Sequence, residues 1–334
     1  MGLAVLFAAA LAFTWAPQTS NTSAGLRGLH VVSSQVVWAS GAKGTFLLTT
    51  DGGTHWRHGV VPGAESLDFR DVEAFDARTA YLLSSGIGSS SRLYFTRDGG
   101  QSWQLLFTNP DPDGFLDALA FWDPSHAIIL GDPVAGHFAI FTTSNAGQSW
   151  SRQATPPALA QEGAFAASGT CLVVRAAKAA WFATGGPGAA RVFRTADAGK
   201  SWTVSKTPLA GANKSSGIFS LFFTASGRGL AVGGDYQKPG DAARTIAITG
   251  DGGKTWSLPK PDHLSGYRSG VTIFRSGAAI AVGTNGADVS TAFNRAWTPL
   301  STPALNAVAS TPSGAAWAVG PGGTIIKFAA KPAR

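Results

Sequence analysis

The stretch Thr96-Arg97-Asp98-Gly99-Gly100-Gln101-Ser102-Trp103 decides the fold, because variants of it recur along the 334-residue chain. The pattern Thr-x-Asp-x-Gly-x-Ser-Trp is kept as TADAGKSW up to Trp202 and as TGDGGKTW up to Trp256, with Thr in place of Ser. Successive motif tryptophans, from Trp56 to Trp297, are 41 to 54 residues apart. Such a period is typical of repeat architectures rather than of one irregular domain.

Two further copies are altered. The copy TTDGGTHW has His55 where a hydroxyl residue is expected, and TSNAGQSW has Asn145 in place of the acid; around Trp297 only the tryptophan is kept. Asp or Asn can accept hydrogen bonds from main-chain amides a few residues on, and Gly supplies the positive φ of a tight turn. The motif therefore predicts structural turns rather than active sites, centred on Asp51, Asp98, Asn145, Asp197 and Asp251.

Each repeat contains four short segments that are typical of β-strands, separated by clusters of Gly, Pro and Asp. The second segment is an apolar run that ends in Gly and occurs seven times, for example as Val37–Gly41 and as Trp317-Ala318-Val319-Gly320. Seven four-stranded units predict an all-β protein, a seven-bladed β-propeller over residues 13–330 with a short tail, 331–334. The last unit lacks its fourth strand, so we expect residues 14–20 to supply it and close the ring.

The amino-terminal residues 1–12 are apolar and uncharged, and they are too short to cross a bilayer as a helix. They predict the core of a secretory signal peptide, with Ala10-Leu11-Ala12 as the cleavage motif. The basic segment that should precede the core is missing, so either the start is assigned too far downstream or the segment is no signal. We expect export to the periplasm or another extracytoplasmic compartment.

Composition narrows the function classes. The net charge of +7 favours an acidic partner, although a merely soluble basic protein has the same charge. No run of Lys and Arg is present, so nucleic-acid binding is not expected. The single cysteine, Cys171, excludes an intramolecular disulfide, and the six histidines show no metal-ligand spacing. We expect neither metal nor cofactor, and a monomer.

In a propeller, the turns that lead into each innermost strand and those between the second and third strands meet on one face, around the channel. Functional residues are often carried by such loops on a rigid frame, although turns are polar everywhere. Applied to this chain, the rule predicts partner-binding residues at Arg27, Lys43, Arg70, Asp117, Asp132, Glu162, Asp235, Tyr236, Lys238, Tyr267 and Arg268.

The aspartate turns, the Trp-Ala-x-Gly segments and the closing strand around Trp15 together resemble the photosystem II stability/assembly factor family, a branch of the Asp-box (BNR) propellers that also include sialidases. The resemblance covers residues 14–328. It implies a non-catalytic exported scaffold that binds a membrane-associated protein client through a basic face, for which Arg27, Arg70 and Arg268 are the candidates. Nothing in the sequence indicates that photosystem II itself is the client.

Two alternatives remain open. A sialidase-like hydrolase would use a tyrosine nucleophile backed by a glutamate, an acid and three arginines. Tyr267, Glu162, Asp71 or Asp117, and the three arginines named above could nominally fill these roles, but the Arg-Ile-Pro motif of sialidases is missing. The second alternative is a glycan-binding propeller without chemistry, which exposed Trp or Tyr side chains on the channel face would favour.

Overall fold

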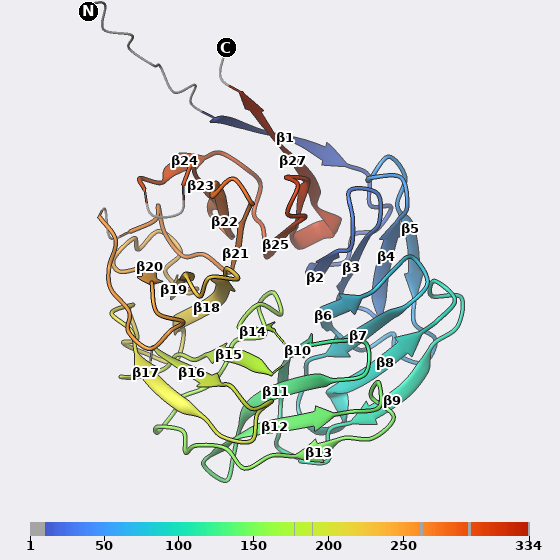
Figure 1. Ribbon diagram of the computed structural model, residues 1–334. Coiled ribbons are helices and arrows are strands. Elements are labelled where there is room, and N and C mark those ends of the chain that lie inside the picture. The colour runs from blue at the N-terminus through green and yellow to red at the C-terminus, as the bar shows by residue number, and fades with distance from the viewer. Residues whose placement is uncertain (1–10, 177, 189, 261–262, 293–294, 333–334) are drawn as a thin grey trace, which may run out of the picture.

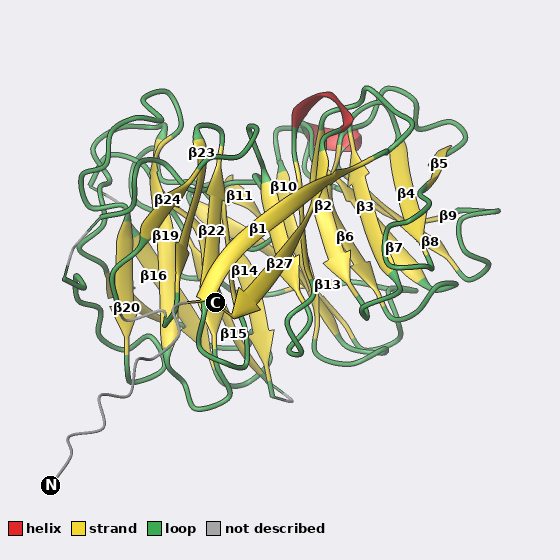
Figure 2. Ribbon diagram, turned by 90° about the horizontal axis from the view of Figure 1, so that it is seen from above, coloured by secondary structure: helices red, strands yellow, loops and turns green. Residues whose placement is uncertain are grey.

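The computed structural model describes residues 11–176, 178–188, 190–260, 263–292 and 295–332. Seven antiparallel sheets are arranged as the blades of a propeller around a central channel (Figure 1). Seen from the side, the strands run between two faces that carry the connecting loops (Figure 2). The predicted fold class, a seven-bladed β-propeller, is confirmed.

The innermost strands surround the channel. They are β2 (Leu26–Val31), β6 (Phe69–Ala74), β10 (Leu116–Phe121), β14 (Leu172–Arg175), β18 (Ser216–Phe223), β21 (Gly270–Ile273) and β25 (Ala307–Ser310). The second strands are β3 (Val37–Gly41), β7 (Ala80–Ser84), β11 (Ala127–Val134), β15 (Ala179–Ala183), β19 (Gly229–Asp235), β22 (Ala279–Gly283) and β26 (Ala316–Val319).

The third and fourth strands complete the blades toward the outside. The third strands are β4 (Thr45–Thr49), β8 (Arg92–Thr96), β12 (His137–Thr143), β16 (Arg191–Thr195), β20 (Ile246–Thr249), β23 (Gly286–Ser290) and β27 (Ile325–Pro332). The fourth strands are β5 (Arg57–Val60), β9 (Gln104–Thr108), β13 (Ser151–Arg152), β17 (Thr203–Lys206), β24 (Thr298–Leu300) and, for blade seven, β1 (Leu11–Gln18). In blade five an isolated bridge between Ile248 and Ser257 stands in the place of the fourth strand. Two short 3₁₀ turns, η1 (Gly88–Ser90) and η2 (Pro321–Gly323), complete the described elements.

The second strands are largely apolar because both faces of each sheet are covered by neighbouring blades. Every residue of β3, β7 and β22 is buried. Separate apolar clusters fill the seven spaces between adjacent blades in the described part of the chain. Between blades one and two, for example, Trp38 and Phe46 pack against Trp103 with ring centroids 6.4 and 5.1 Å away. The motif tryptophans thus help to join neighbouring blades.

The aspartate turns share one hydrogen-bond pattern. In the turn of blade two, the Thr96 hydroxyl donates to Asp98 Oδ1 over 2.8 Å and accepts from the Gly100 amide over 2.9 Å, while the Ser102 amide donates to Asp98 Oδ1 over 3.0 Å. At the altered turn, the Asn145 side-chain amide donates to the Ser149 hydroxyl over 2.9 Å. These polar side chains therefore satisfy main-chain amides inside their own turns, next to the third strands.

The amino-terminal strand closes the ring. β1 pairs with β27 from Leu11 opposite Pro332 to Gln18 opposite Ile325, which confirms the predicted closing strand and starts it three residues earlier than expected. The side-chain oxygen of Gln18 accepts hydrogen bonds from the indoles of Trp56 (3.0 Å) and Trp317 (3.1 Å), so it joins blade seven to blade one. Residues 1–10 of the predicted signal peptide lie outside the described residues. No helix in the described ranges is long and apolar enough to cross a membrane.

Candidate functional site at the channel mouth

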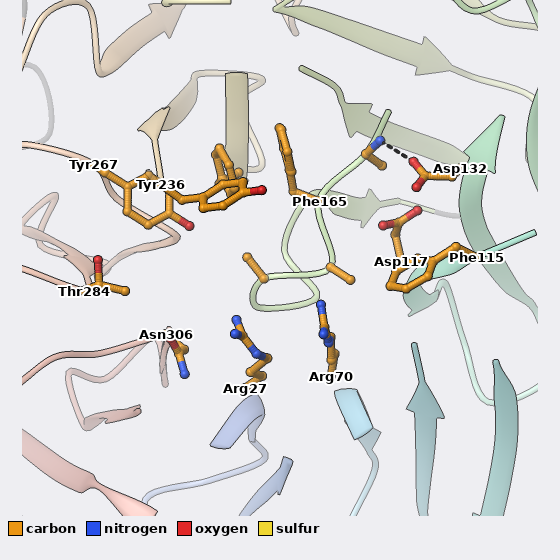
Figure 3. Close-up of a pocket in the computed structure, with 14 residues that line it drawn as sticks. Arg27, Arg70, Phe115, Asp117, Asp132, Phe165, Tyr236, Tyr267, Thr284 and Asn306 are labelled. Carbon is orange, nitrogen blue, oxygen red and sulfur yellow. Dashed lines mark hydrogen bonds between the residues drawn. The ribbon is translucent and has the colours of Figure 1, made fainter. Parts of the chain in front are cut away.

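One end of the channel opens into a cavity of about 430 Å³. Its lining side chains come from the starts of inner strands and from the turns between second and third strands, so this mouth lies on the face opposite the aspartate turns. We call it the upper mouth; the described residues that line it are Arg27, Arg70, Phe115, Asp117, Asp132, Ala164, Phe165, Ala166, Ala167, Phe219, Tyr236, Tyr267, Thr284 and Asn306. Figure 3 shows Arg27 and Arg70 on one side of this cavity, Asp117 and Asp132 with the Phe115 ring on another, and Phe165, Tyr236 and Tyr267 on a third.

β-Bulges aim several of these side chains into the cavity. The pairing register of the first and second strands skips one residue in blades one, two, three and five, and the skipped residues are Arg27, Arg70, Asp117 and Phe219. An extra residue in one strand turns its side chain away from the ladder and bends the strand. The same irregularity thus places a different side chain at the mouth from each of these blades.

The connection from blade three to blade four blocks the channel. The channel plug (residues 164–170) lines the upper mouth with Ala164–Ala167, and its remaining residues line a second cavity of about 420 Å³, the lower cavity. The plug is held from several blades: the Ala164 amide donates to Asp132 Oδ1 over 2.9 Å, and the Thr170 and Ser220 hydroxyls are 2.6 Å apart. The upper mouth is therefore a blind pocket rather than a pore.

The two arginines of the mouth differ in their partners. Arg70 donates from Nε to Asp68 Oδ2 over 2.8 Å, and its guanidinium lies 5.8 Å from the centroid of the Phe115 ring. Arg27 has no ion pair or side-chain hydrogen bond with any residue that the structure describes, and burial together with the charge of Arg70 lowers the pKa of its guanidinium. Arg27 thus presents a cation to the cavity that the fold leaves unneutralised.

Two carboxylates lie on another side of the same cavity. Asp117 is 1% exposed, and its Oδ2 has no hydrogen-bond partner among the described residues. Burial and the nearby charge of Asp132 raise the pKa of Asp117 well above its usual range, and burial raises the pKa of Asp132 to about 6. The mouth therefore contains both a basic side and an acidic side.

Aromatic rings form a further part of the cavity wall. Phe165 of the plug stacks on Phe219 with centroids 3.8 Å apart, and Tyr267 meets Phe219 edge-on at 4.7 Å. Tyr236 packs against both phenylalanines at 6.2 to 6.5 Å and is 48% exposed, so it forms the rim. Such a wall can pack against the apolar part of a ligand whose polar groups reach the charged sides.

Six of the predicted partner-binding residues meet at the upper mouth: Arg27, Arg70, Asp117, Asp132, Tyr236 and Tyr267. The other five do not line it. Lys43 and Lys238 are exposed in turns, and Asp235 is buried, where it accepts hydrogen bonds from Ser215 and Asn213.

The remaining two predicted residues are held in buried ion pairs. Glu162 accepts from Arg191 Nε over 2.7 Å, and Arg268, which is fully buried, donates from Nε to Asp288 Oδ2 over 2.7 Å. The nominal sialidase set is therefore not assembled in one place, because Glu162 and Arg268 point to these partners and Tyr267 is 4% exposed. Among the described residues, no group of three or more His, Cys, Asp or Glu side chains is arranged to hold a metal ion.

Sequence reasoning missed Phe115, Phe165, Phe219, Thr284 and Asn306. A signal for two of them exists in the sequence: the tetrads Leu26-Arg27-Gly28-Leu29, Ile218-Phe219-Ser220-Leu221 and Leu305-Asn306-Ala307-Val308 share an apolar–variable–small–apolar pattern, whose second position lines the mouth. Phe165 has no such signal, because it belongs to the plug and not to a repeat position.

The fold and the mouth define a seven-bladed propeller with a blind, charged and aromatic-walled pocket at one end of its channel. Comparisons with known proteins show similarity to one family. The model of the family described as "Photosynthesis system II assembly factor YCF48" matches residues 8–170. The photosystem II stability/assembly factor HCF136 of Arabidopsis thaliana is 27% identical over 113 residues, which are 33% of this chain and 26% of that relative. The chain is thus similar to the photosystem II stability/assembly factor family, as its repeats predict.

Solved structures agree on the fold. YCF48 bound to D1 peptide superposes with a TM-score of 0.68 at 15% identity, covering 96% of this chain and 97% of the other. YCF48 from Cyanidioschyzon merolae gives 0.67 at 16% identity, with 94% and 98% covered. A GH74 enzyme from Niastella koreensis gives 0.62 at 15% identity, with 94% of this chain and 53% of the enzyme covered. At these identities the likeness concerns the fold alone.

Proposed function

We propose that this chain is a non-catalytic scaffold that holds a segment of a protein client at the upper mouth and acts in the assembly or stability of a membrane-associated complex. The observation that carries the proposal is Arg27, a cation without an ion-pair partner among the described residues, which lies beside Arg70 in a blind pocket. A carboxylate of the client would neutralise Arg27, and charge-assisted hydrogen bonds of this kind are among the stronger polar contacts. A relative whose structure is described as bound to D1 peptide supports a polypeptide ligand.

Apolar side chains next to the mouth favour a polypeptide over a free small anion. Ile87 is 69% exposed and Leu159 is 43% exposed. Both line a cavity of about 740 Å³ that shares Phe115, Asp132, Ala164 and Phe165 with the upper mouth. Exposed apolar residues that surround a polar pocket are common where a protein partner docks. A client segment can therefore leave the pocket across Ile87 and Leu159.

The cellular setting of the proposal rests on the sequence. The apolar segment 1–12 supports export, and the net charge of +7 supports a client with an acidic surface. We propose a monomeric protein in the periplasm or another extracytoplasmic space, close to a membrane.

A crosslinking pull-down of the tagged protein from its own organism tests the scaffold function. The test variant is Arg27→Glu/Arg70→Glu, which reverses both charges of the mouth. Arg268 is unsuitable as a target, because its replacement would leave Asp288 buried without its cation. The matched control is Arg78→Glu/Arg97→Glu, which makes the same charge change at exposed positions beside the aspartate turns.

The scaffold function predicts that wild type and control capture the same subunit of a membrane complex and that the mouth variant does not. Capture of that subunit by all three proteins would move the binding surface elsewhere. Capture of no partner by wild type would remove the support for a scaffold.

A further inference from the structure

The acidic side of the upper mouth, like the basic side, is formed by residues at irregularities in strand pairing. Asp117 is the extra residue of the bulge at the start of β10, and Asp132 is the residue that the pairing of β11 with β12 skips between Gly131 and Pro133. Two separate irregularities thus turn two carboxylates of blade three toward one cavity. In Figure 3 the carboxyl groups of Asp117 and Asp132 face each other, with the Arg70 guanidinium nearby.

The fold does not use all the hydrogen-bonding capacity of these carboxylates. Asp132 Oδ1 accepts from the Ala164 amide over 2.9 Å and so fixes the plug. Asp117 Oδ2 lies buried without a hydrogen-bond partner among the described residues, although such a buried polar atom destabilises the fold. Arg70, the nearest cation, gives its Nε hydrogen to Asp68 instead. The described residues therefore supply no hydrogen-bond donor to Asp117 Oδ2.

We infer that the upper mouth recognises a dipolar peptide segment, in which a carboxylate reaches Arg27 and Arg70 and a Lys or Arg side chain reaches Asp117 and Asp132. The inference rests on the proposed function, in that the ligand is a segment of a protein client. A purely acidic segment would satisfy the arginines but would offer no hydrogen-bond donor to Asp117 and Asp132 and would disfavour their ionisation further. A basic side chain offers several N–H donors and no acceptor, which is what Asp117 Oδ2 and Asp132 require.

The aromatic wall suits the stem of such a side chain. Phe115 and Phe165 both line the cavity that Asp117 and Asp132 share. Long basic side chains pack their methylene groups along apolar surface while the charged end reaches a polar site. The pocket thus provides apolar surface for the methylene groups of a Lys or Arg side chain and carboxylates for its charged end.

The pH dependence of peptide binding provides a second test of this inference. Burial raises the pKa of Asp117 well above its usual range and that of Asp132 to about 6, so ionising the pair in the free protein is less favourable than ionising exposed carboxyls. A bound ammonium or guanidinium favours the ionised carboxylates, so binding releases protons and tightens as pH rises from about 5 to about 8.

The other groups around the pair do not mask this dependence. Burial raises the pKa of Tyr267 above this range. Cys171, which follows the plug, stays a thiol because burial raises its pKa. Asp71, on β6, lies at the lower cavity. Its contribution to the pH dependence of peptide binding should be the same in wild type and in variants of Asp117 and Asp132.

Short synthetic peptides test the inference. The probes are N-acetylated, C-amidated and free of histidine, and they carry one Glu and one Lys separated by one, two or three residues. In matched probes norleucine replaces Lys, or Gln replaces Glu. Binding is measured by calorimetry at pH 5.5 and pH 8 to wild type, to Asp117→Asn/Asp132→Asn and to Arg27→Gln/Arg70→Gln.

The substituted Asn side chains keep an oxygen for the Ala164 amide, and thermal unfolding checks that both variants fold. Asp123→Asn, at an exposed turn on the opposite face, is the control for loss of a carboxylate. We expect at least one Glu/Lys spacing to bind wild type about tenfold or more tightly than its norleucine counterpart, as charge-assisted hydrogen bonds provide. This preference and its rise with pH should vanish in Asp117→Asn/Asp132→Asn and persist in Asp123→Asn.

The failures of the two proposals are distinguishable. If norleucine peptides bind as tightly as lysine peptides while binding still depends on Glu and on Arg27 and Arg70, the dipolar inference is overturned and the scaffold function stands. If no probe binds wild type at any spacing, both the inference and peptide binding at this mouth are contradicted.

Discussion

The hydroxyl of Ser168 donates a hydrogen bond of 2.7 Å to the main-chain carbonyl oxygen of Ser269, which precedes the inner strand of blade six. Ser168 belongs to the connection into blade four, so this bond joins non-adjacent blades through the middle of the propeller. The Ser269 hydroxyl in turn donates to the Asn306 carbonyl oxygen over 2.7 Å. This chain of bonds fixes the channel plug, and the plug makes the upper mouth a pocket with a floor.

Replacing Ser168 by Ala should therefore loosen the plug. The substitution leaves the buried Ser269 carbonyl without this donor and should lower the free energy of unfolding by roughly 1–3 kcal/mol. Urea denaturation measures the loss, and hydrogen exchange should show faster exchange confined to residues 164–170. The exposed Ser23 offers the control Ser23→Ala, for which neither quantity should change.

A second prediction concerns Asp71, at the lower cavity. Burial, and then the charge of Glu73, raise the pKa of Asp71 to about 8, although its Oδ2 accepts from the Leu119 amide over 2.7 Å. Because the carboxyl ionises at lower pH in the unfolded chain, Asp71 makes the fold less stable as pH rises from about 4 to about 8. Asp71→Asn keeps an acceptor for Leu119 and removes this loss.

Urea denaturation at pH 5 and pH 8 checks the Asp71 prediction. The stability of Asp71→Asn relative to wild type should be greater at pH 8 than at pH 5. An equal difference at both pH values would mean that Asp71 ionises in the fold as readily as in the unfolded chain.

The aspartate turns predict the opposite dependence on pH. Hydrogen bonds from the Ser102 hydroxyl and amide hold the pKa of Asp98 well below its usual range, so its contribution is present above about pH 4 and is lost at more acidic pH. Asp98→Ala should lower the urea midpoint more than Asp98→Asn, because the turn at Asn145 already forms with an amide. The difference between wild type and Asp98→Asn should shrink between pH 4 and pH 2.

The closing strand should contribute measurably to stability. Trp15 of β1 is partly buried against the core of blades six and seven, and its indole donates to the Ser301 carbonyl oxygen over 2.8 Å. Trp15→Ala removes both interactions and should cost about 2–3 kcal/mol, below the range for a fully buried tryptophan. Trp15→Phe keeps most of the packing and should lower the free energy of unfolding by about 1 kcal/mol. If Trp15→Ala and Trp15→Phe lost the same free energy of unfolding in denaturation, the whole effect would belong to the hydrogen bond.

The sequence predicted the fold because the determinants of the fold repeat. Each tryptophan step and each apolar run ending in Gly reports one blade, and even the closing strand could be anticipated from the missing strand of the last repeat. The rule that the turns into the inner strands and between the second and third strands meet on one face also located Arg27, Arg70, Asp117 and Asp132. These turns could be placed because the ends of the strands were predicted together with the strands.

The rest of the site depends on contacts between residues far apart in the sequence. Arg268 fits the turn rule as well as Arg70 does, yet its guanidinium is satisfied inside blade six by Asp288, a residue of β23. Phe165 enters the channel because the long connection to blade four folds inward, which no repeat position records. Ion-pair partners and the path of an irregular connection are tertiary properties, and a single sequence does not specify them.

Photocrosslinking from the rim of the upper mouth tests the central claim most directly. A benzoylphenylalanine placed at Tyr236, which is 48% exposed, is compared with one at Val204, which is 46% exposed on the outer strand of blade four. Irradiation in the native organism should join one client subunit to position 236, and not to position 204, and the adduct should disappear in the Arg27→Glu/Arg70→Glu background. Equal adducts at both positions, or an adduct at 236 that survives the double substitution, would contradict binding at the upper mouth.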